Sequence, residues 1–252
     1  MGSEFTILSS REREVLSAIY RGSRTRNEIA ERVGLSPPHL SRILKKLRSS
    51  GLVSFEDGLV DVLFKGEVHA IFYDIFSKYD KLFKSIDLNK YILHDIPENL
   101  LRRMYELSNV ITIESSREIF QPHPIVVDNI AKSRYVVGYG RMLYPEYAMM
   151  FLDLAKRGVH VEAIINQKTF NEIRELYGSQ LEEYMRCRNS RLLVSKRNFN
   201  FSVILTDTAF FMSMFFKNGT LDYTKFYAWY DAEGRRWGRD LVEHIKKYSE
   251  EI

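Results

Sequence analysis

Apolar residues recur at every third or fourth position in three successive stretches near the start of the chain. This spacing lines them along one side of an α-helix. The pattern predicts helices over residues 10–20, 25–34 and 36–50. Ser36 suits the N-cap of the third helix, proline is tolerated in its first turn, and Gly51 ends it. Its buried side is formed by Leu40, Ile43, Leu44 and Leu47.

Two short segments of alternating hydrophobic and polar residues follow, on either side of Asp57-Gly58. That dipeptide is typical of a two-residue β-hairpin turn. Gly34 ends the second helix just before Ser36 begins the third, which is helix-turn-helix spacing. Three helices and a hairpin therefore predict a winged helix, an α+β domain, over residues 6–66.

A helix with an unusually wide apolar and aromatic face is predicted next, within a connector over residues 67–90. The apolar positions on this face are Val68, Ile71, Phe72, Ile75, Phe76, Leu82 and Phe83. Such a face needs a cover. It packs on the following domain or pairs with its copy in a homodimer, as DNA-reading helices commonly act in pairs on two half-sites.

Helical and strand patterns alternate over the rest of the chain, residues 91–252. The alternation predicts an α/β domain with a mixed, largely parallel sheet flanked by helices. Helices are expected over residues 97–109, 124–133, 146–158, 169–186 and 237–249. Strands are expected over residues 110–114, 135–140, 159–165, 191–195, 201–206 and 209–215, the last two as a hairpin.

Composition narrows the class of protein. The chain has 252 residues and is 45% hydrophobic, which is typical of a globular protein. No apolar run reaches the roughly 18 residues of a membrane span, and no signal peptide is expected. Residues 1–5, MGSEF, read as vector-derived. A single cysteine, Cys187, and six scattered histidines favour a reduced, cytoplasmic protein without disulfides, metal or cofactor.

Charge is concentrated on the predicted helix-turn-helix. Residues 21–48 hold eight Lys and Arg and two acidic residues, a local charge of +6, whereas the whole chain carries +4. A basic face on one element is typical of nucleic-acid binding. The hairpin, in contrast, carries Glu56, Asp57 and Asp61, which phosphates would repel. We therefore expect the hairpin to stay out of the minor groove or to contact it through backbone alone.

The segment RNEIAERVGLSPPHLSRILKKLRSSGLV resembles the winged helix-turn-helix of bacterial and archaeal transcription regulators. The resemblance implies double-stranded DNA as the partner, with the third helix in the major groove. The exposed side of that helix carries the side chains expected to reach base edges, namely His39, Ser41, Arg42 and Lys45 or Lys46. Arg24 and Arg26 suit phosphates. The full candidate set is Arg24, Arg26, Ser36, Pro38, His39, Ser41, Arg42, Lys45 and Lys46. The alternative is a winged helix that binds only proteins.

The remainder of the chain resembles the middle or sensor domain of archaeal methanogenesis and filament regulators. The segments that carry this resemblance are HDIPENLLRRMYELSN, IFQPHPIVVDNIAKS, YPEYAMMFLDLAKRGVHVEAII, VILTD and FFKNGTLDYTKFYAWYDAEGRRWGRDLVEHIKKYS. The best-matching positions are Asp222, Asp231 and Trp237-Gly238. In that family the domain follows a winged helix, and the whole protein is a transcription regulator.

A second resemblance, to the phospholipase D superfamily, bears on catalysis. Its enzymes need a His-x-Lys pair ahead of an aspartate, whereas this chain has Asn200 and Ser202 ahead of Asp207. Asparagine is no nucleophile and serine carries no charge for a phosphate. We therefore expect a binding pocket and no enzyme, with a phosphodiesterase as the alternative.

A small-molecule effector would bind outside the carboxyl ends of the strands. That location gives Tyr139, Arg141, Asn166 and Asp207, beside an aromatic run that serves either as core or as pocket lining. The run comprises Tyr223, Phe226, Tyr227, Trp229 and Tyr230. The candidate effector residues are Tyr139, Arg141, Asp207, Tyr223 and Trp229. The sequence identifies neither the operator nor the effector, nor whether transcription is repressed or activated.

Overall fold

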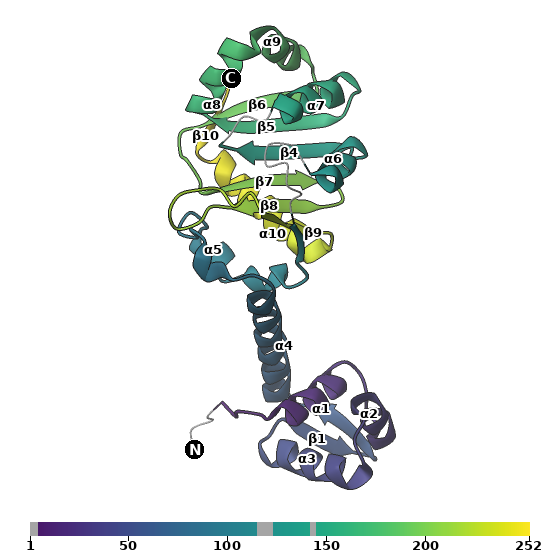
Figure 1. The fold of residues 1–252 in the computed structure, drawn as a ribbon. Coiled ribbons are helices and arrows are strands. Elements are labelled where there is room, and N and C mark those ends of the chain that lie inside the picture. Colours follow the sequence, from purple (N-terminus) through teal and green to yellow (C-terminus); the bar gives the residue numbers. More distant parts are fainter. Residues whose placement is uncertain (1–4, 115–122, 142–144) are drawn as a thin grey trace. The chain divides into compact units, whose positions relative to one another are not determined.

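The computed structural model describes residues 5–114, 123–141 and 145–252. The chain divides into two compact units, Met1–Ser77 and Lys78–Ile252. Figure 1 shows a small unit of helices with a two-stranded hairpin and a larger unit built around one sheet. The division falls inside one helix, α4 (Phe64–Ser85).

Three helices and a hairpin make up most of the N-terminal unit, which confirms the predicted winged helix. They are α1 (Ser10–Tyr20), α2 (Arg26–Val33), α3 (Pro37–Ser49), β1 (Val53–Glu56) and β2 (Leu59–Val62). Capping boxes begin α1 and α2, because the side chains of Ser9 and Thr25 each accept a hydrogen bond from the backbone of a glutamate three residues on. Gly34 ends α2 in the left-handed region, with φ of 65°.

The third helix begins without a side-chain cap. Ser36 occupies the N-cap position, but its hydroxyl makes no capping hydrogen bond. Pro37 and Pro38 lack an N–H group, so fewer backbone donors need a partner there. The predicted stripe is buried as expected, with Leu40, Ile43, Leu44 and Leu47 in one core with residues of α1 and α2.

The hairpin turns through two residues with positive φ, Asp57 at 49° and Gly58 at 79°. Both central residues of a type I′ turn have this geometry, so the predicted turn is confirmed. The start of α4 passes close to the backbone at Leu52, the residue just before β1. A Cβ atom on Gly66 would lie 2.1 Å from the carbonyl oxygen of Leu52, so only glycine fits at this position.

The segment ahead of α1 is tied to α4 by side chains. The ring of Phe5, a residue that the sequence groups with the vector-derived ones, stacks on the ring of His69 with centroids 4.0 Å apart. The backbone N–H of Thr6 donates to Nε2 of His69 at 3.1 Å, and that of Leu8 donates to the hydroxyl of Tyr73 at 2.8 Å. These bonds anchor the segment on α4 within the N-terminal unit.

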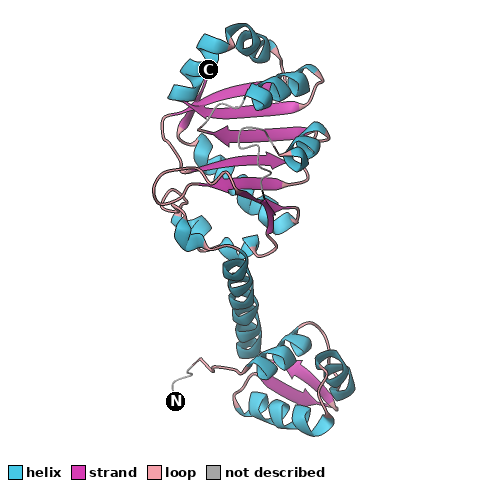
Figure 2. Cartoon of the chain, viewed as in Figure 1, coloured by secondary structure: helices cyan, strands magenta, loops and turns pink. Residues whose placement is uncertain are grey.

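The C-terminal unit is built on an eight-stranded sheet of order β10-β6-β5-β4-β7-β8-β9-β3. The strands are β3 (Ile111–Glu114), β4 (Tyr135–Gly140), β5 (His160–Asn166), β6 (Ser190–Ser195), β7 (Phe201–Thr206), β8 (Phe210–Met214), β9 (Lys225–Trp229) and β10 (Ser249–Glu251). The sequence pattern locates six of these and misses β9 and β10. Figure 2 shows the strands of this sheet in magenta.

The expectation of a largely parallel sheet is wrong. Among the described strands, only β4 with β5 and β5 with β6 are parallel, and the other five neighbouring pairs are antiparallel. Helices connect the parallel pairs, which keeps their direction the same. The chain then returns through β7, β8 and β9 without a helix between them, so the direction reverses at each step.

The remaining helices are α5 (Glu98–Leu101), α6 (Pro124–Ala131), α7 (Pro145–Lys156), α8 (Gln167–Leu176), α9 (Gly178–Arg186) and α10 (Ala232–Lys246), with 3-10 turns at Leu88–Lys90 and Met104–Leu107. The single helix predicted over residues 97–109 is therefore wrong. The indole N–H groups of Trp237 and Trp229 donate to the carbonyls of Leu100 and Leu107. The bond at Leu100 uses a carbonyl that a continuous helix would use itself, for the N–H of Met104.

Two hydrophobic cores lie on opposite faces of the sheet, because side chains alternate along each strand. On one face Val137, Val203 and Phe210 share a core with Trp237 and Leu241 of α10. The opposite face carries a second core that includes residues of α6, α7 and α9. In Figure 1, α6 and α7 lie in front of the sheet and α10 lies behind it.

Candidate DNA-binding surface and effector cavities

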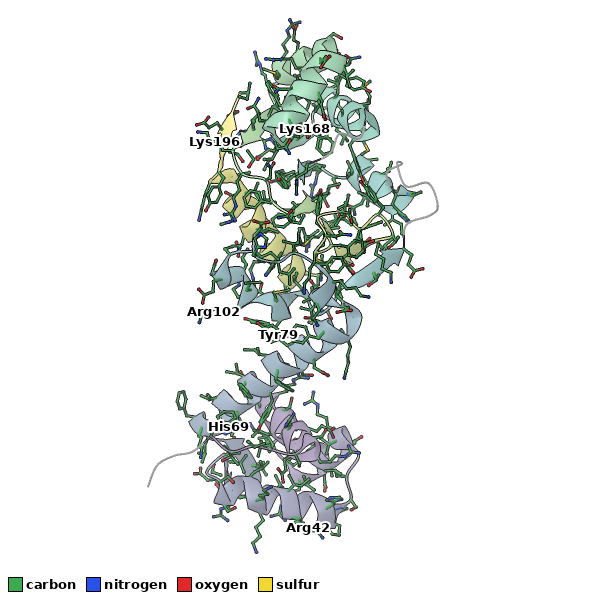
Figure 3. All side chains as sticks on the ribbon, turned by 60° about the vertical axis from the view of Figure 1, so that its left-hand side comes forward. Arg42, His69, Tyr79, Arg102, Lys168 and Lys196 are labelled. Carbon is green, nitrogen blue, oxygen red and sulfur yellow. The ribbon has the colours of Figure 1, made fainter. Side chains whose placement is uncertain are left out.

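The outer side of α3 presents the predicted base-reading residues. His39, Ser41, Arg42 and Lys45 are all exposed, and Figure 3 labels Arg42 on this helix, with its side chain directed away from the unit. Within the described part of the chain, neither Arg42 nor Lys45 forms a side-chain hydrogen bond or ion pair. Both cations are therefore available to a partner.

Lys46, the neighbour of Lys45, is held by the protein itself. Its Nζ lies 2.7 Å from Oε1 of Glu12, a largely buried carboxylate on α1. Burial disfavours the ionised form of Glu12, but hydrogen bonds from Lys46 and Ser9 outweigh it and lower the pKa of this carboxyl group. The sequence left Lys45 and Lys46 as alternatives, and the structure distinguishes them: Lys46 links α3 to α1.

Arg24 is paired with the acidic hairpin. Its guanidinium lies 2.8 Å from Oδ1 of Asp61, and both side chains are at least one third exposed. Exposed pairs of this kind contribute about 0–1 kcal/mol. A phosphate group can therefore replace the carboxylate as the partner of Arg24 at little cost.

An aromatic ring on the hairpin supports two further arginines. The guanidinium carbons of Arg26 and Arg48 lie 5.7 and 5.3 Å from the ring centroid of Phe55. Such stacking holds a guanidinium in place while its N–H groups stay free. Arg48 was absent from the predicted set, because the sequence does not show that Phe55 lies between the two arginines.

The start of α3 adds exposed groups without charge. Ser36 and Pro38 are both exposed, and the hydroxyl of Ser36 is not used as a cap. A hydroxyl group at the start of a helix suits a phosphate oxygen. The predicted residues thus lie on α3 and at its start, and, in the case of Arg24 and Arg26, beside the hairpin.

A polar cavity of about 460 Å³ lies at the carboxyl ends of β4, β5 and β6. Its described lining includes Arg141, Asn166, Lys168, Ser195, Lys196 and Asn198, and Figure 3 labels the two lysines. Arg141 donates to Oδ1 of Asn200 at 2.7 Å and lies over the ring of Phe215. We call this the edge cavity.

Asp207 is not part of the edge cavity, although the sequence grouped it with Arg141. Since β7 runs antiparallel to β4, its carboxyl end lies beside the start of β4. There Oδ1 of Asp207 accepts a hydrogen bond from the backbone N–H of Arg134 at 3.1 Å. The error in strand direction therefore separates two residues that the prediction had placed together.

A second cavity of about 220 Å³ lies on the sheet face that carries α6, α7 and α8. Small residues line its floor, and mostly apolar side chains line its walls. The floor residues are Gly138, Gly140, Ala163, Ser202 and Ser213. The walls include His123, Val126, Tyr147, Phe151, Ile173, Phe211, Tyr223 and Phe226. We call this the inner cavity.

Tyr223 is thus placed in the inner cavity, but Tyr139 and Trp229 have their side chains in the core on the opposite face. The hydroxyl oxygen of Tyr139 accepts a hydrogen bond from the backbone N–H of Phe199 at 2.9 Å. Burial raises the pKa of Tyr139 to about 12. The indole of Trp229 donates to the carbonyl of Leu107 at 2.8 Å. Both residues stabilise the fold and only the backbone of Tyr139 borders the cavity.

Comparison with known families assigns both units. A winged helix-turn-helix DNA-binding family matches residues 8–54, and the family described as methanogenesis regulatory protein FilR1, middle domain, matches residues 119–248. The second match covers more than half of the chain. The chain belongs to the FilR1 middle-domain family. The winged-helix match runs from just ahead of α1 into β1, so it includes all of α3.

Solved structures add only distant similarity. The archaeal chromatin protein TrmBL2 is 13% identical over 96% of this chain and 94% of its own, with a TM-score of 0.44. An IclR transcriptional regulator from Alicyclobacillus acidocaldarius is 12% identical over 95% and 94%, with a TM-score of 0.25. HmgR of Pseudomonas aeruginosa is 11% identical over 93% and 96%, with a TM-score of 0.24. These scores are too low to support an argument. No curated protein sequence matches the chain.

The FilR1 middle-domain match includes the described lining of the inner cavity and most of that of the edge cavity. The sequence missed the two serines of the floor, Ser202 and Ser213, as functional candidates. The sequence contains a signal for them, because side chains alternate between the two faces of a strand and both serines fall on the same face of β7 and β8. Without the fold, however, neither cavity side nor core side could be assigned.

Among the positions that resemble a degenerate phospholipase D site, Asn200 makes structural hydrogen bonds. The side-chain amide of Asn200 accepts from Arg141 and donates to Oδ2 of Asp95, while Ser202 lies on the floor of the inner cavity. The similarity search gives no support for a phospholipase D relationship. In the described parts of the chain, no three His, Cys, Asp or Glu side chains are placed to share a metal ion, and no helix is long and apolar enough to span a membrane.

Proposed function

We propose that the protein is a cytoplasmic transcription regulator that binds double-stranded operator DNA with sequence specificity. The observation that carries the proposal is the outer side of α3, where Arg42 and Lys45 have no side-chain partner among the described residues. This surface belongs to a segment that matches a DNA-binding family. FilR1 itself is described as a methanogenesis regulatory protein, and a regulatory role for this chain agrees with that description.

In this proposal α3 enters the major groove. His39, Ser41, Arg42 and Lys45 contact base edges, with Arg42 able to form two hydrogen bonds to one guanine. Contacts to phosphates come from Arg24, Arg26 and the start of α3 at Ser36 and Pro38. Lys46 contributes to DNA binding through its positive charge while its ion pair with Glu12 links α3 to α1. The hairpin, with Asp61 already beside Arg24, stays outside the minor groove.

A pair of variants tests the assignment of bases and phosphates. Arg42→Ala should weaken binding to the native promoter by about 5- to 150-fold, since a good base contact contributes about 1–3 kcal/mol, and should change binding to an unrelated duplex little. Arg24→Ala should weaken both and reduce the salt dependence by about one phosphate contact. Mobility shifts at two salt concentrations measure this, with Lys196→Ala in the C-terminal unit as control. Equal losses on both duplexes for both variants would contradict base reading.

We also propose a homodimer that uses the apolar face of α4. Within the N-terminal unit, Phe64 is 80% exposed, and Val68, Ile71, Phe72 and Phe76 are each exposed by about half. A contiguous face of this kind is unusual in a monomer. Two copies would place two α3 helices on two half-sites. Sedimentation should give a dimer that Ile71→Glu dissociates, whereas Leu176→Glu, at an exposed site on α8, should not; an unaltered dimer in Ile71→Glu would exclude this face.

The C-terminal unit is proposed to sense a small effector. The proposed functional division is residues 6–66 for DNA, 67–90 as connector and 91–252 for the effector. The segment after α4 is bonded to the end of β8, because the N–H of Ile92 donates to the carbonyl of Phe215 at 2.9 Å. An effector that binds one conformation better shifts the population toward it and changes operator affinity.

The proposed role of the C-terminal unit is binding, with no catalysis. A phosphodiesterase assay on a model ester tests this, since neither Asn200 nor Ser202 supplies the nucleophile or the cation that the reaction needs. No turnover is expected. Turnover that Asp207→Ala abolishes would contradict the proposal and restore the enzymatic alternative.

A further inference from the structure

The inner cavity exists because several neighbouring strand positions carry almost no side chain. Gly138 on β4 pairs with Ala163 on β5, and Ser202 on β7 pairs with Ser213 on β8. All four point to the same face of the sheet, since side chains alternate along a strand. A Cβ atom on Gly138 would already lie 3.1 Å from the ring of Phe151. Phe151 of α7 therefore packs closely on the sheet at Gly138, and the cavity is lined by the sheet on one side and by residues of α7 on the other.

The walls of the cavity are apolar and partly aromatic. Phe151 and Ile173 contribute from the helices, and Phe211 and Phe226 from the sheet. A cavity of about 150 Å³ lined by such side chains stays dry and takes up benzene. The inner cavity, at about 220 Å³, has room for a ring with one substituent or for a fused pair of small rings.

Two hydroxyl groups face this apolar space without a partner. Neither Ser202 nor Ser213 forms a side-chain hydrogen bond with any residue that the structure describes, and they lie opposite one another on neighbouring strands. Both serines are partly exposed, so their hydroxyl groups are open to a ligand as donors or acceptors. A ligand with one hydroxyl or carbonyl group beside its ring can pair with both serines, and one with an N–H group can donate to one of them.

No described side chain directs a full charge into the cavity. Lys225 borders it, but alternation along β9 puts its side chain on the face of Tyr227 and Trp229. Both carboxylate oxygens of Asp222 are occupied, Oδ2 by the hydroxyl of Tyr91 and Oδ1 by Thr224.

The imidazole of His123 also lines the cavity and caps α6. Its Nδ1 accepts a hydrogen bond from the backbone N–H of Ile125 at 3.2 Å, which requires that nitrogen to be unprotonated. Nδ1 of His123 is therefore occupied by the cap of α6. An anionic or cationic ligand would lose its hydration and gain no opposite charge in return.

We infer that the inner cavity binds an uncharged, largely apolar molecule of about the size of a singly substituted benzene, held through one polar group by Ser202 and Ser213. This inference rests on the proposed sensing function, because it names the class of effector that the C-terminal unit takes. Sugar phosphates, nucleotides and carboxylic acids belong to other classes and do not fit the charge of the site.

Benzyl alcohol and indole are suitable probes for the full-length protein. Each should bind saturably in calorimetry and raise the melting temperature in proportion to the logarithm of its concentration. Benzoate and glucose 6-phosphate should bind at least tenfold more weakly. The double variant Ser202→Ala, Ser213→Ala should bind benzyl alcohol about three- to tenfold more weakly, the effect of one lost hydrogen bond.

Variants that fill the cavity provide the decisive comparison. Ala163→Leu should abolish binding of both probes, and Ser213→Leu serves as the second filling variant should the first fail to fold. The melting temperature and promoter binding of each variant without probe show that it is folded. Unchanged probe binding in a folded, filled variant would overturn the inference, as would tighter binding of benzoate or the sugar phosphate, or no saturable binding of either probe.

The same titrations separate this inference from the proposed function. Binding of benzyl alcohol in the wild type that filling abolishes supports the ligand class, whatever happens to DNA affinity. A change in promoter affinity on binding supports sensing as well, and an unchanged affinity contradicts sensing alone. Absence of probe binding, with promoter recognition intact, overturns the ligand class alone.

Discussion

Tyr91 donates a hydrogen bond of 2.7 Å from its hydroxyl to Oδ2 of Asp222, and its oxygen lies 2.9 Å from the hydroxyl of Tyr227. All three residues are buried. Burial, followed by these two bonds, raises the pKa of Tyr91 well above its usual range, so the phenol stays protonated. The bond joins the segment that follows α4 to the residue that precedes Tyr223, which lines the inner cavity.

Tyr91→Phe should therefore destabilise the C-terminal unit by about 1–3 kcal/mol, since it leaves a buried carboxylate oxygen without its donor. Urea unfolding measures the change. Tyr20→Phe, at an exposed tyrosine on α1, is the matched control and should change stability by less than about 0.5 kcal/mol. Equal effects of the two substitutions would show that the bond between Tyr91 and Asp222 contributes nothing to stability.

Gly66→Ala should destabilise the N-terminal unit by about 1–3 kcal/mol, because the new methyl group would meet the carbonyl oxygen of Leu52 at 2.1 Å. Gly178→Ala provides the control, since nothing lies within 4 Å of a Cβ atom at that site. Thermal unfolding of both variants tests this. A melting temperature for Gly66→Ala as high as that of the control would mean that α4 does not pass Leu52 so closely.

Lys45→Ala and Lys46→Ala should affect different properties, although the residues are adjacent. Lys46→Ala removes the partner of the largely buried carboxylate of Glu12 and should cost about 1–3 kcal/mol of stability. Lys45→Ala should leave stability unchanged and weaken promoter binding. Unfolding curves and mobility shifts on the two variants distinguish the roles, and a stability loss from Lys45→Ala equal to that from Lys46→Ala would contradict them.

The stability contributed by Glu106 should depend on pH. Its side chain is 3% exposed and pairs with Arg103 and Arg236 at 2.8 and 3.1 Å. Burial opposes ionisation of Glu106, but the two arginines outweigh it and lower the pKa of this carboxyl group in the folded protein. A lowered pKa means that the stabilisation is complete above the unfolded value of about 4.5 and is lost as the pH falls through the folded value.

Glu106→Gln tests this dependence. The variant should be less stable than the wild type by about 1–3 kcal/mol at pH 7, and the difference should shrink as the pH is lowered below 4.5, the unfolded pKa. Urea unfolding at pH 7 and at pH 4 or below gives both values. A difference that is independent of pH, or that grows in acid, would show that ionisation of Glu106 is not what stabilises the fold.

The sequence predicted the N-terminal unit in detail because its signals are local. Gly34 with positive φ and the Asp57-Gly58 turn each act within a few residues of the backbone that they shape. The stripe on α3 is equally local, so its exposed side could be assigned before the fold was known. Arg48 was missed because its support, Phe55, comes from a different element.

The C-terminal unit depends on contacts that the sequence does not show. The stretch from Tyr223 to Tyr230 reads as an aromatic run, whereas Lys225–Trp229 within it form a strand with Phe226 on one face and Tyr227 on the other. Missing this strand hid the antiparallel pairings of β9 with β8 and with β3. Strand direction then decided which predicted residues meet, and it is why Arg141 and Asp207 do not.

The small residues on the floor of the inner cavity affect how such proteins can diversify. Its shape depends on the small side chains at Gly138, Ala163, Ser202 and Ser213. The strands keep their backbone hydrogen bonds whatever side chain occupies these positions. Exchanging one small residue for another of slightly different bulk or polarity can thus retune chemical selectivity in a single mutational step. Under the proposed sensing function, related regulators would acquire new inducers in this way while the promoter that they recognise stays the same.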